Sequence, residues 1–145
     1  MIGKFRYILV IVVFVGYIGY IIGRDYKYRY RFRDNYVIGS ITGTSFPPFT
    51  VLEYKKGKKS FTGDHTDTLL IEFEEMPSDI FYRSLDSLVN EGVSGWSVSN
   101  VQYRYSIVWG NGLPAPLGEN DDEDAHLNII LTKGHKRAEI RYGSW

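Results

Sequence analysis

The sequence predicts an α+β protein in which one N-terminal transmembrane helix precedes a small, mainly antiparallel sheet with one packed helix. Three observations lead to this fold class. Residues 7–23 form an apolar run of 17 residues without a charged side chain. Several later segments show the two-residue alternation of strands, and they follow one another without helices in between, as in antiparallel sheets. Only the segment between Ser78 and Gly92 has the period and end signals of a helix in a soluble domain.

Length and composition indicate one folded domain. A chain of 145 residues without its first 23 can build a single modest core. Hydrophobic residues make up 43% and charged residues 23% of the chain, which excludes a wholly disordered protein. There is no cysteine, so disulfides, thiolate metal sites and cysteine nucleophiles are excluded.

Charge is unevenly distributed along the chain, although the formal net charge is zero. The region after residue 36 holds ten Lys or Arg and fifteen Asp or Glu residues, so it is mildly acidic. A nucleic-acid-binding domain needs a clustered basic face. We therefore expect no nucleic-acid partner.

Residues 1–23 are predicted to be a short tail and a transmembrane anchor. The run has no polar face, and at about 1.5 Å per residue it spans roughly 25 Å, the short end of what a bilayer core needs. A cleaved signal peptide is the alternative, but no small-residue cleavage site follows the run. We expect a single-pass signal anchor in the membrane. Its orientation stays open. The bases after the run favour a cytoplasmic domain, whereas moving Lys4, Arg6 and the terminal amine across the membrane is unfavourable. Between the two we slightly favour an extracytoplasmic domain.

Residues 24–36 are predicted to be a basic and aromatic strand beside the membrane. Aromatic residues occupy positions 26, 28, 30 and 32, and bases occupy the positions between them, so a strand would place the two kinds on opposite faces. In one interpretation the bases contact anionic lipid headgroups. In the other, this is an ordinary first strand that packs its rings on the domain. The membrane-contact candidates are Lys27, Arg29, Arg31 and Arg33.

Residues 37–145 are predicted to form the α+β domain. We expect a loop over 39–48, because glycines and Pro47-Pro48 interrupt regular structure, and strands over 49–54 and 66–74. The helix begins after Ser78, a good N-cap, and ends at Gly92. Next we expect one long strand over 96–109 with a bulge near Ser99 and Asn100, a loop over 110–124, and a hairpin of strands 127–132 and 137–142.

Aromatic residues of the 96–109 segment are the candidate ligand or partner surface. If exposed, they could stack on a glycan or bury against another protein. The simpler interpretation is that they form the core of a small sheet domain. These residues are Trp96, Tyr103, Tyr105 and Trp109.

The acidic segment 119–124 contains weak candidates for a cation site. Asn120, Asp122 and Asp124 have the spacing that opens an EF-hand loop, but Ala125 and Leu131 stand where that motif needs glycine and glutamate. We therefore expect a solvated loop, no bound metal and no cofactor.

Taken together, these features predict a non-enzymatic interaction or accessory protein at the membrane, with another membrane or envelope protein as partner. No catalytic residues are recognisable, since no nucleophile is set beside a base. The alternative is an extracytoplasmic ligand-binding domain that takes a cation on the acidic loop or a glycan on exposed aromatics. Specific partner and oligomeric state stay open.

Overall fold

The structure is a computed structural model, and it describes residues 2–61, 63–92, 95–110, 113, 115–116 and 124–144; the side chains of residues 2–6, 24–25 and 27–29 are outside this description. The chain divides into two compact units, Met1–Phe32 and Arg33–Trp145. Each unit is described by itself.

The first unit consists of helix α1 (Ile2–Tyr30). The strand predicted over 24–36 is wrong, because the helix continues to Tyr30 and a second helix begins at Asn35. The rings of Tyr26 and Tyr30 stack with centroids 4.2 Å apart, and residues four apart meet in this way on a helix. Extending an existing helix adds one hydrogen bond per residue, whereas a lone strand in this unit would leave its backbone groups unpaired.

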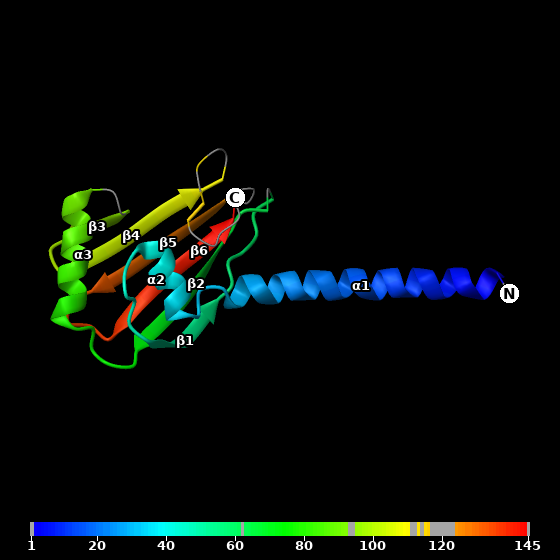
Figure 1. The fold of residues 1–145 in the computed structure, drawn as a ribbon, viewed down its shortest axis with the longest axis horizontal. Helices are drawn as coiled ribbons and strands as arrows, with labels where there is room; N and C mark the ends of the chain where they lie inside the picture. The colour runs from blue at the N-terminus through cyan, green and yellow to red at the C-terminus, as the bar shows by residue number, and fades with distance from the viewer. Residues whose placement is uncertain are drawn as a thin grey trace. The chain divides into compact units, whose positions relative to one another are not determined.

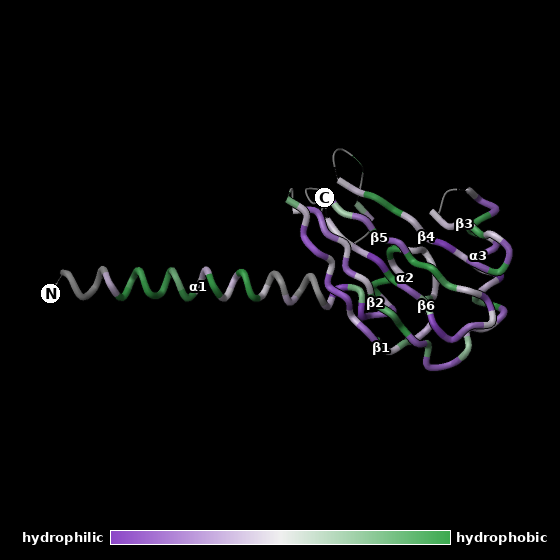
Figure 2. The backbone as a smooth tube through the Cα atoms, turned by 180° about the vertical axis from the view of Figure 1, so that it is seen from behind, coloured by the Kyte–Doolittle hydropathy of each residue, from purple (hydrophilic) through white to green (hydrophobic). Residues whose placement is uncertain are grey.

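The middle of α1 is hydrophobic (Figure 2), and its large apolar side chains between Tyr7 and Ile22 are exposed. Among the described residues, no helix is long and apolar enough to cross a membrane. The uncharged run of 17 residues spans about 25 Å, whereas the hydrocarbon core of a bilayer measures about 30 Å. The predicted transmembrane helix is therefore wrong, as are the signal anchor and the single-pass membrane localisation that depend on it.

The second unit opens with helix α2 (Asn35–Thr42), where the sequence predicts a loop from residue 39 onward. The side chain of Asp34 caps this helix by accepting a hydrogen bond from the N–H of Tyr36 at 2.8 Å. Gly43 ends it with φ of 69°, a left-handed conformation that glycine adopts without strain. The short helix is stable because Ile38 and Ile41 on its inner face are buried.

Helix α3 (Asp79–Glu91) confirms the predicted helix and both of its ends. Ser78 accepts a hydrogen bond from the N–H of Phe81 at 3.3 Å, and Gly92 closes the last turn with φ of 69°. The buried side chains of Phe81, Tyr82 and Leu85 lie on one face of the helix, as its apolar period requires.

Six strands form one antiparallel sheet, which confirms the α+β class and the predicted antiparallel pairing. Figure 1 shows the strands in the order β1-β2-β6-β5-β4-β3. Together with α1, α2 and α3 they are all the helices and strands of the described residues. The strands are β1 (Phe49–Lys55), β2 (His65–Phe73), β3 (Trp96–Ser99), β4 (Gln102–Trp109), β5 (Ala125–Thr132) and β6 (Arg137–Ser144).

The segment 96–109 is a hairpin of β3 and β4 and not the single bulged strand that the sequence predicts. Ser99 pairs with Gln102, which leaves Asn100 and Val101 as the connecting loop. Asn100 has φ of 55°, and asparagine tolerates this left-handed conformation better than most residues. The change of apolar parity near residue 99 therefore marks a reversal of the chain.

Both α2 and α3 lie on one face of the sheet. Tyr105 of β4 donates a hydrogen bond to α2, and Tyr103, two residues away on the same face, donates one to α3. Most inward residues of the central strands are buried on this face, while most of their neighbours are partly or fully exposed on the other. The core of the sheet comprises Leu69, Ile71, Phe73, Leu127, Ile129, Leu131 and Ile140.

Candidate functional site

The four aromatic residues proposed as a ligand surface lie inside the domain. Their exposed fractions are 6% for Trp96, 4% for Tyr103, 2% for Tyr105 and 1% for Trp109. Rings at this depth contact the core and present no face on which a glycan could stack. The structure therefore places these residues in the core, as in the simpler interpretation of the sequence.

Trp96 and Tyr105 hold the C-terminal end of α2. The indole N–H of Trp96 donates to the carbonyl oxygen of Thr42 at 3.1 Å, and the Tyr105 hydroxyl donates to that of Ile41 at 2.9 Å. The last carbonyls of a helix have no partner within the helix, so donors from elsewhere must satisfy them. The two rings pair across β3 and β4 with centroids 5.2 Å apart.

Tyr103 attaches α3 to the sheet in a similar way. Its hydroxyl donates to a carboxylate oxygen of Asp86 at 2.8 Å. Burial and, after it, the neighbouring Asp86 raise the pKa of Tyr103 to about 12. This tyrosine is thus a neutral donor at physiological pH and not a candidate acid or base for catalysis.

Two of the four basic candidates, Arg31 and Arg33, have described side chains, and they belong to different units. The Arg31 guanidinium lies over the ring of Phe32, 5.4 Å from its centroid, and in the other unit Arg33 lies over Tyr54 at 5.7 Å. The side chains of Lys27 and Arg29 lie outside the described residues. Of the acidic candidates, Asn120 and Asp122 are also outside, and only Asp124, partly buried before β5, is described.

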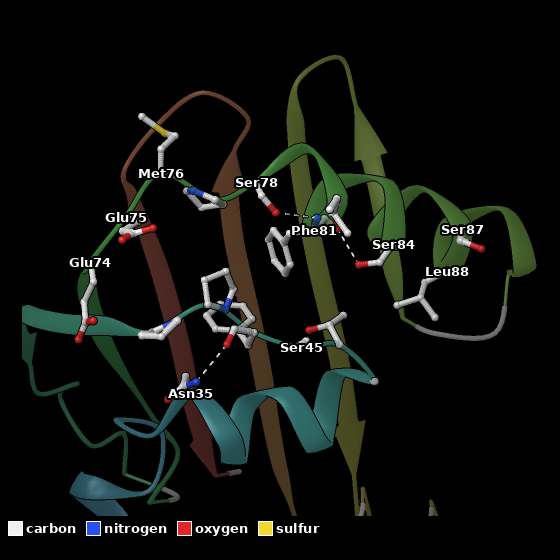
Figure 3. Close-up of a pocket in the computed structure, with 17 residues that line it drawn as sticks. Asn35, Ser45, Glu74, Glu75, Met76, Ser78, Phe81, Ser84, Ser87 and Leu88 are labelled. Atoms are coloured by element: carbon white, nitrogen blue, oxygen red, sulfur yellow. Dashed lines mark hydrogen bonds between the residues drawn. The ribbon is translucent and has the colours of Figure 1, made fainter.

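A wide groove in the second unit is the main candidate site, and the sequence analysis does not predict it. One wall is the 43–48 loop after α2, and the other is the β2–α3 connection together with α3 as far as Leu88. The volume of the groove is about 1170 Å³. Figure 3 shows Glu74, Glu75 and Met76 at one end, and Ser84, Ser87 and Leu88 along α3 at the other.

Hydrogen bonds and ring contacts fix both walls of the groove. The Asn35 side chain donates to the carbonyl oxygen of Phe46 at 3.1 Å, and the N–H of Glu74 donates to that of Pro48 at 3.0 Å. Phe46 meets Phe81 edge to face at 6.0 Å between centroids and joins the loop to α3. Since both rings are buried, the groove has a preformed aromatic floor.

The groove is apolar along its walls and negative at one end. Ile80 and Met76 are large apolar residues with exposed fractions of 72% and 51%. Glu74 and Glu75 are the charged residues of its lining, and the part of the chain that the structure describes adds no lysine, arginine or histidine to it. Three of the other lining residues are prolines, which have no backbone N–H to donate. They are Pro47, Pro48 and Pro77.

A smaller polar cavity of about 430 Å³ lies where β2, β5 and β6 carry His65, His126 and Ser144. The hydroxyl of Thr66 and Nε2 of His126 are 3.1 Å apart. Burial and then the charge of His65 lower the pKa of His126, so this imidazole is neutral near pH 7. Within the described part of the chain, no group of three His, Cys, Asp or Glu side chains could hold a metal ion.

Comparison with known proteins finds no match: no family model fits this chain, and neither a curated protein nor a solved structure is significantly similar to it. The protein class is therefore defined by its fold, a six-stranded antiparallel sheet with α2 and α3 on one face, and by the groove beside α3. The only sequence signals for the groove are Pro47-Pro48 and Pro77, which read alone indicate loop breaks.

Proposed function

We propose that this chain is a non-enzymatic interaction module whose groove, between the 43–48 loop and α3, binds an extended segment of a partner protein. The observation that carries the proposal is the groove itself. Pockets for small molecules measure roughly 300–1,000 Å³ and enclose most of their ligand. A groove of about 1170 Å³ with exposed apolar walls exceeds that range and suits a longer ligand.

The dimensions of α3 support a peptide ligand. From Asp79 to Leu88 the helix rises by nine steps of about 1.5 Å, roughly 14 Å. An extended chain advances about 3.3 Å per residue, so this wall has room for roughly four residues of a peptide. The firm aromatic floor lowers the conformational entropy that binding would cost, because the walls need no ordering.

Peptide display on the purified full chain tests this function, in one detergent buffer throughout because α1 exposes apolar side chains. A library of random peptides of about ten residues is selected on the native chain. Binders are then compared on Ser84→Trp, which puts a large ring into the groove from an exposed position of α3. Asn90→Trp is the matched control, because Asn90 is exposed on the same helix and does not line the groove.

We expect peptides that bind the native chain and Asn90→Trp with similar affinity and bind Ser84→Trp at least tenfold more weakly. Circular dichroism of the three proteins checks that they share one fold. If no peptides are recovered, or if all recovered peptides bind Ser84→Trp unchanged, the groove is not a peptide-binding site and the proposed function is wrong.

A further inference from the structure

We infer that the groove selects a basic and apolar segment, with a lysine or arginine held at the Glu74–Glu75 end and an apolar side chain held about four residues away against α3. This inference rests on the proposed function and names the chemical class of the partner segment. It follows from the order in which charge, apolar surface and hydrogen-bonding capacity succeed one another along the groove.

Charge determines what binds at the first end. Glu74 and Glu75 are exposed side by side between β2 and α3, and among the described residues no lysine, arginine or histidine lines the groove to offset them. Two adjacent carboxylates repel each other and also repel an acidic ligand, whereas a lysine or arginine relieves that repulsion. The described charges of the groove therefore complement a cationic side chain.

Apolar surface determines what binds farther along. Ile80 projects from the first turn of α3 with 72% of its surface exposed, and Leu88 lies two turns later, partly buried. Pro47 on the facing loop is also partly buried. An apolar side chain inserted between these walls would remove all three from water, which favours binding at about 25 cal/mol per Å² of apolar area.

Hydrogen-bonding capacity points to the same class of ligand. Proline supplies a carbonyl but no N–H, so the stretches that contain Pro47, Pro48 and Pro77 lack three donors. Two hydroxyls of the lining already donate within the protein: Ser84 donates to the carbonyl oxygen of Phe81 at 2.7 Å, and Ser87 donates to a carboxylate oxygen of Glu91 at 3.3 Å. A wall poor in donors suits a ligand that brings its own, as lysine, arginine and a free peptide N–H do.

Three synthetic peptides of about ten residues test this inference by fluorescence anisotropy. The first carries two lysines and, about four residues later, two leucines in a glycine-serine background. The second has glutamates in place of the lysines, and the third places the lysines directly beside the leucines. Each is titrated with the full chain and with the charge-reversed variant Glu74→Lys, Glu75→Lys at low and high salt. The control variant, Glu53→Lys with Glu139→Lys, reverses two charges on the sheet, outside the groove.

The first peptide should bind the native chain about tenfold more tightly than the second, the size that two exposed ion pairs supply. It should also bind more tightly than the third. Charge reversal at Glu74 and Glu75 should invert the preference between lysines and glutamates, high salt should reduce it, and the control variant should keep it.

Equal binding of the first and second peptides, or a preference that survives charge reversal at Glu74 and Glu75, would overturn the inference. If display yields groove-dependent peptides but the basic peptide does not bind, the selectivity inferred here is wrong and the proposed function stands. If display yields no groove-dependent peptide, the proposed function itself fails.

Discussion

Replacing Tyr105 with phenylalanine should lower the free energy of unfolding by about 2 kcal/mol, because it removes one hydrogen-bond donor and keeps the ring. The hydroxyl is buried and donates to the Ile41 carbonyl at 2.9 Å, in the last turn of α2. This substitution therefore tests whether the sheet, through β4, holds the end of that helix in place.

The magnitude follows from the surroundings of the two atoms. A neutral hydrogen bond contributes about 1 kcal/mol, and a buried carbonyl left without a donor costs about 1–3 kcal/mol. The Ile41 carbonyl belongs to the helix end, where no later N–H of α2 can replace the lost donor. The Trp96 indole cannot compensate, because it already donates to Thr42 at 3.1 Å. Only one oxygen atom is removed, so little new cavity is created.

The pH dependence supplies an independent check. Burial raises the pKa of Tyr105 to about 12 from its ordinary value of 10.0. The unfolded chain therefore releases this proton at a lower pH than the folded chain does. The stability contributed by the neutral hydroxyl is fully present below pH 10 and is lost as pH rises from about 10 to about 12. The difference between the native chain and Tyr105→Phe should shrink over that window.

Urea denaturation of the full chain followed by tryptophan fluorescence measures both effects, since the three tryptophans all lie in the second unit. Tyr36→Phe is the matched control, because Tyr36 lies on α2 with an exposed fraction of 81%. It should change stability by less than about 0.5 kcal/mol. If Tyr105→Phe costs no more than this control, the argument that β4 caps α2 is refuted.

Two further predictions concern the end of the sheet where β2, β5 and β6 meet. A Cβ at Gly143 would overlap the backbone of His65 on the paired strand, so Gly143→Ala should destabilise the fold by several kcal/mol. The control substitution Ser144→Ala should not. Thermal melting compares the two variants, and similar melting temperatures would contradict the close approach of the strands. Because burial lowers the pKa of His126 below its ordinary value of 6.5, the unfolded chain binds this proton first as the pH falls. The stability that the neutral imidazole contributes should therefore be fully present above pH 6.5 and decrease below it. Urea midpoints measured between about pH 7 and pH 5 should fall less steeply with decreasing pH in His126→Gln than in the native chain. Equal slopes would show that burial does not lower the pKa of His126.

Local patterns predict those elements whose periodicity and end signals agree. Ser78 and Gly92 bound α3 as expected, and the alternation of β2 and the turn between β5 and β6 place these strands within two residues. Patterns of one kind alone mislead. The aromatic-basic alternation after residue 24 has the period of a strand, yet α1 continues to Tyr30, because a helix pairs its own backbone groups whereas a strand needs a partner strand. The parity change near Asn100 has two explanations, a bulge or a turn, and pairing of Ser99 with Gln102 decides for the turn.

The sequence by itself determined the α+β class, the capped helix α3 and the succession of antiparallel strands, since these depend on residues close together in the chain. Only the tertiary structure decided the roles of Trp96 and Tyr105, because their donors meet α2 carbonyls 54 and 64 positions away. It also decided the groove. Residues 43–48 and 74–88 form its two walls because β1 and β2 pair antiparallel and bring Pro48 beside Glu74. No local sequence pattern around Pro48 or Glu74 predicts that they lie side by side, since this contact results from pairing between strands and not from the local preference of either residue.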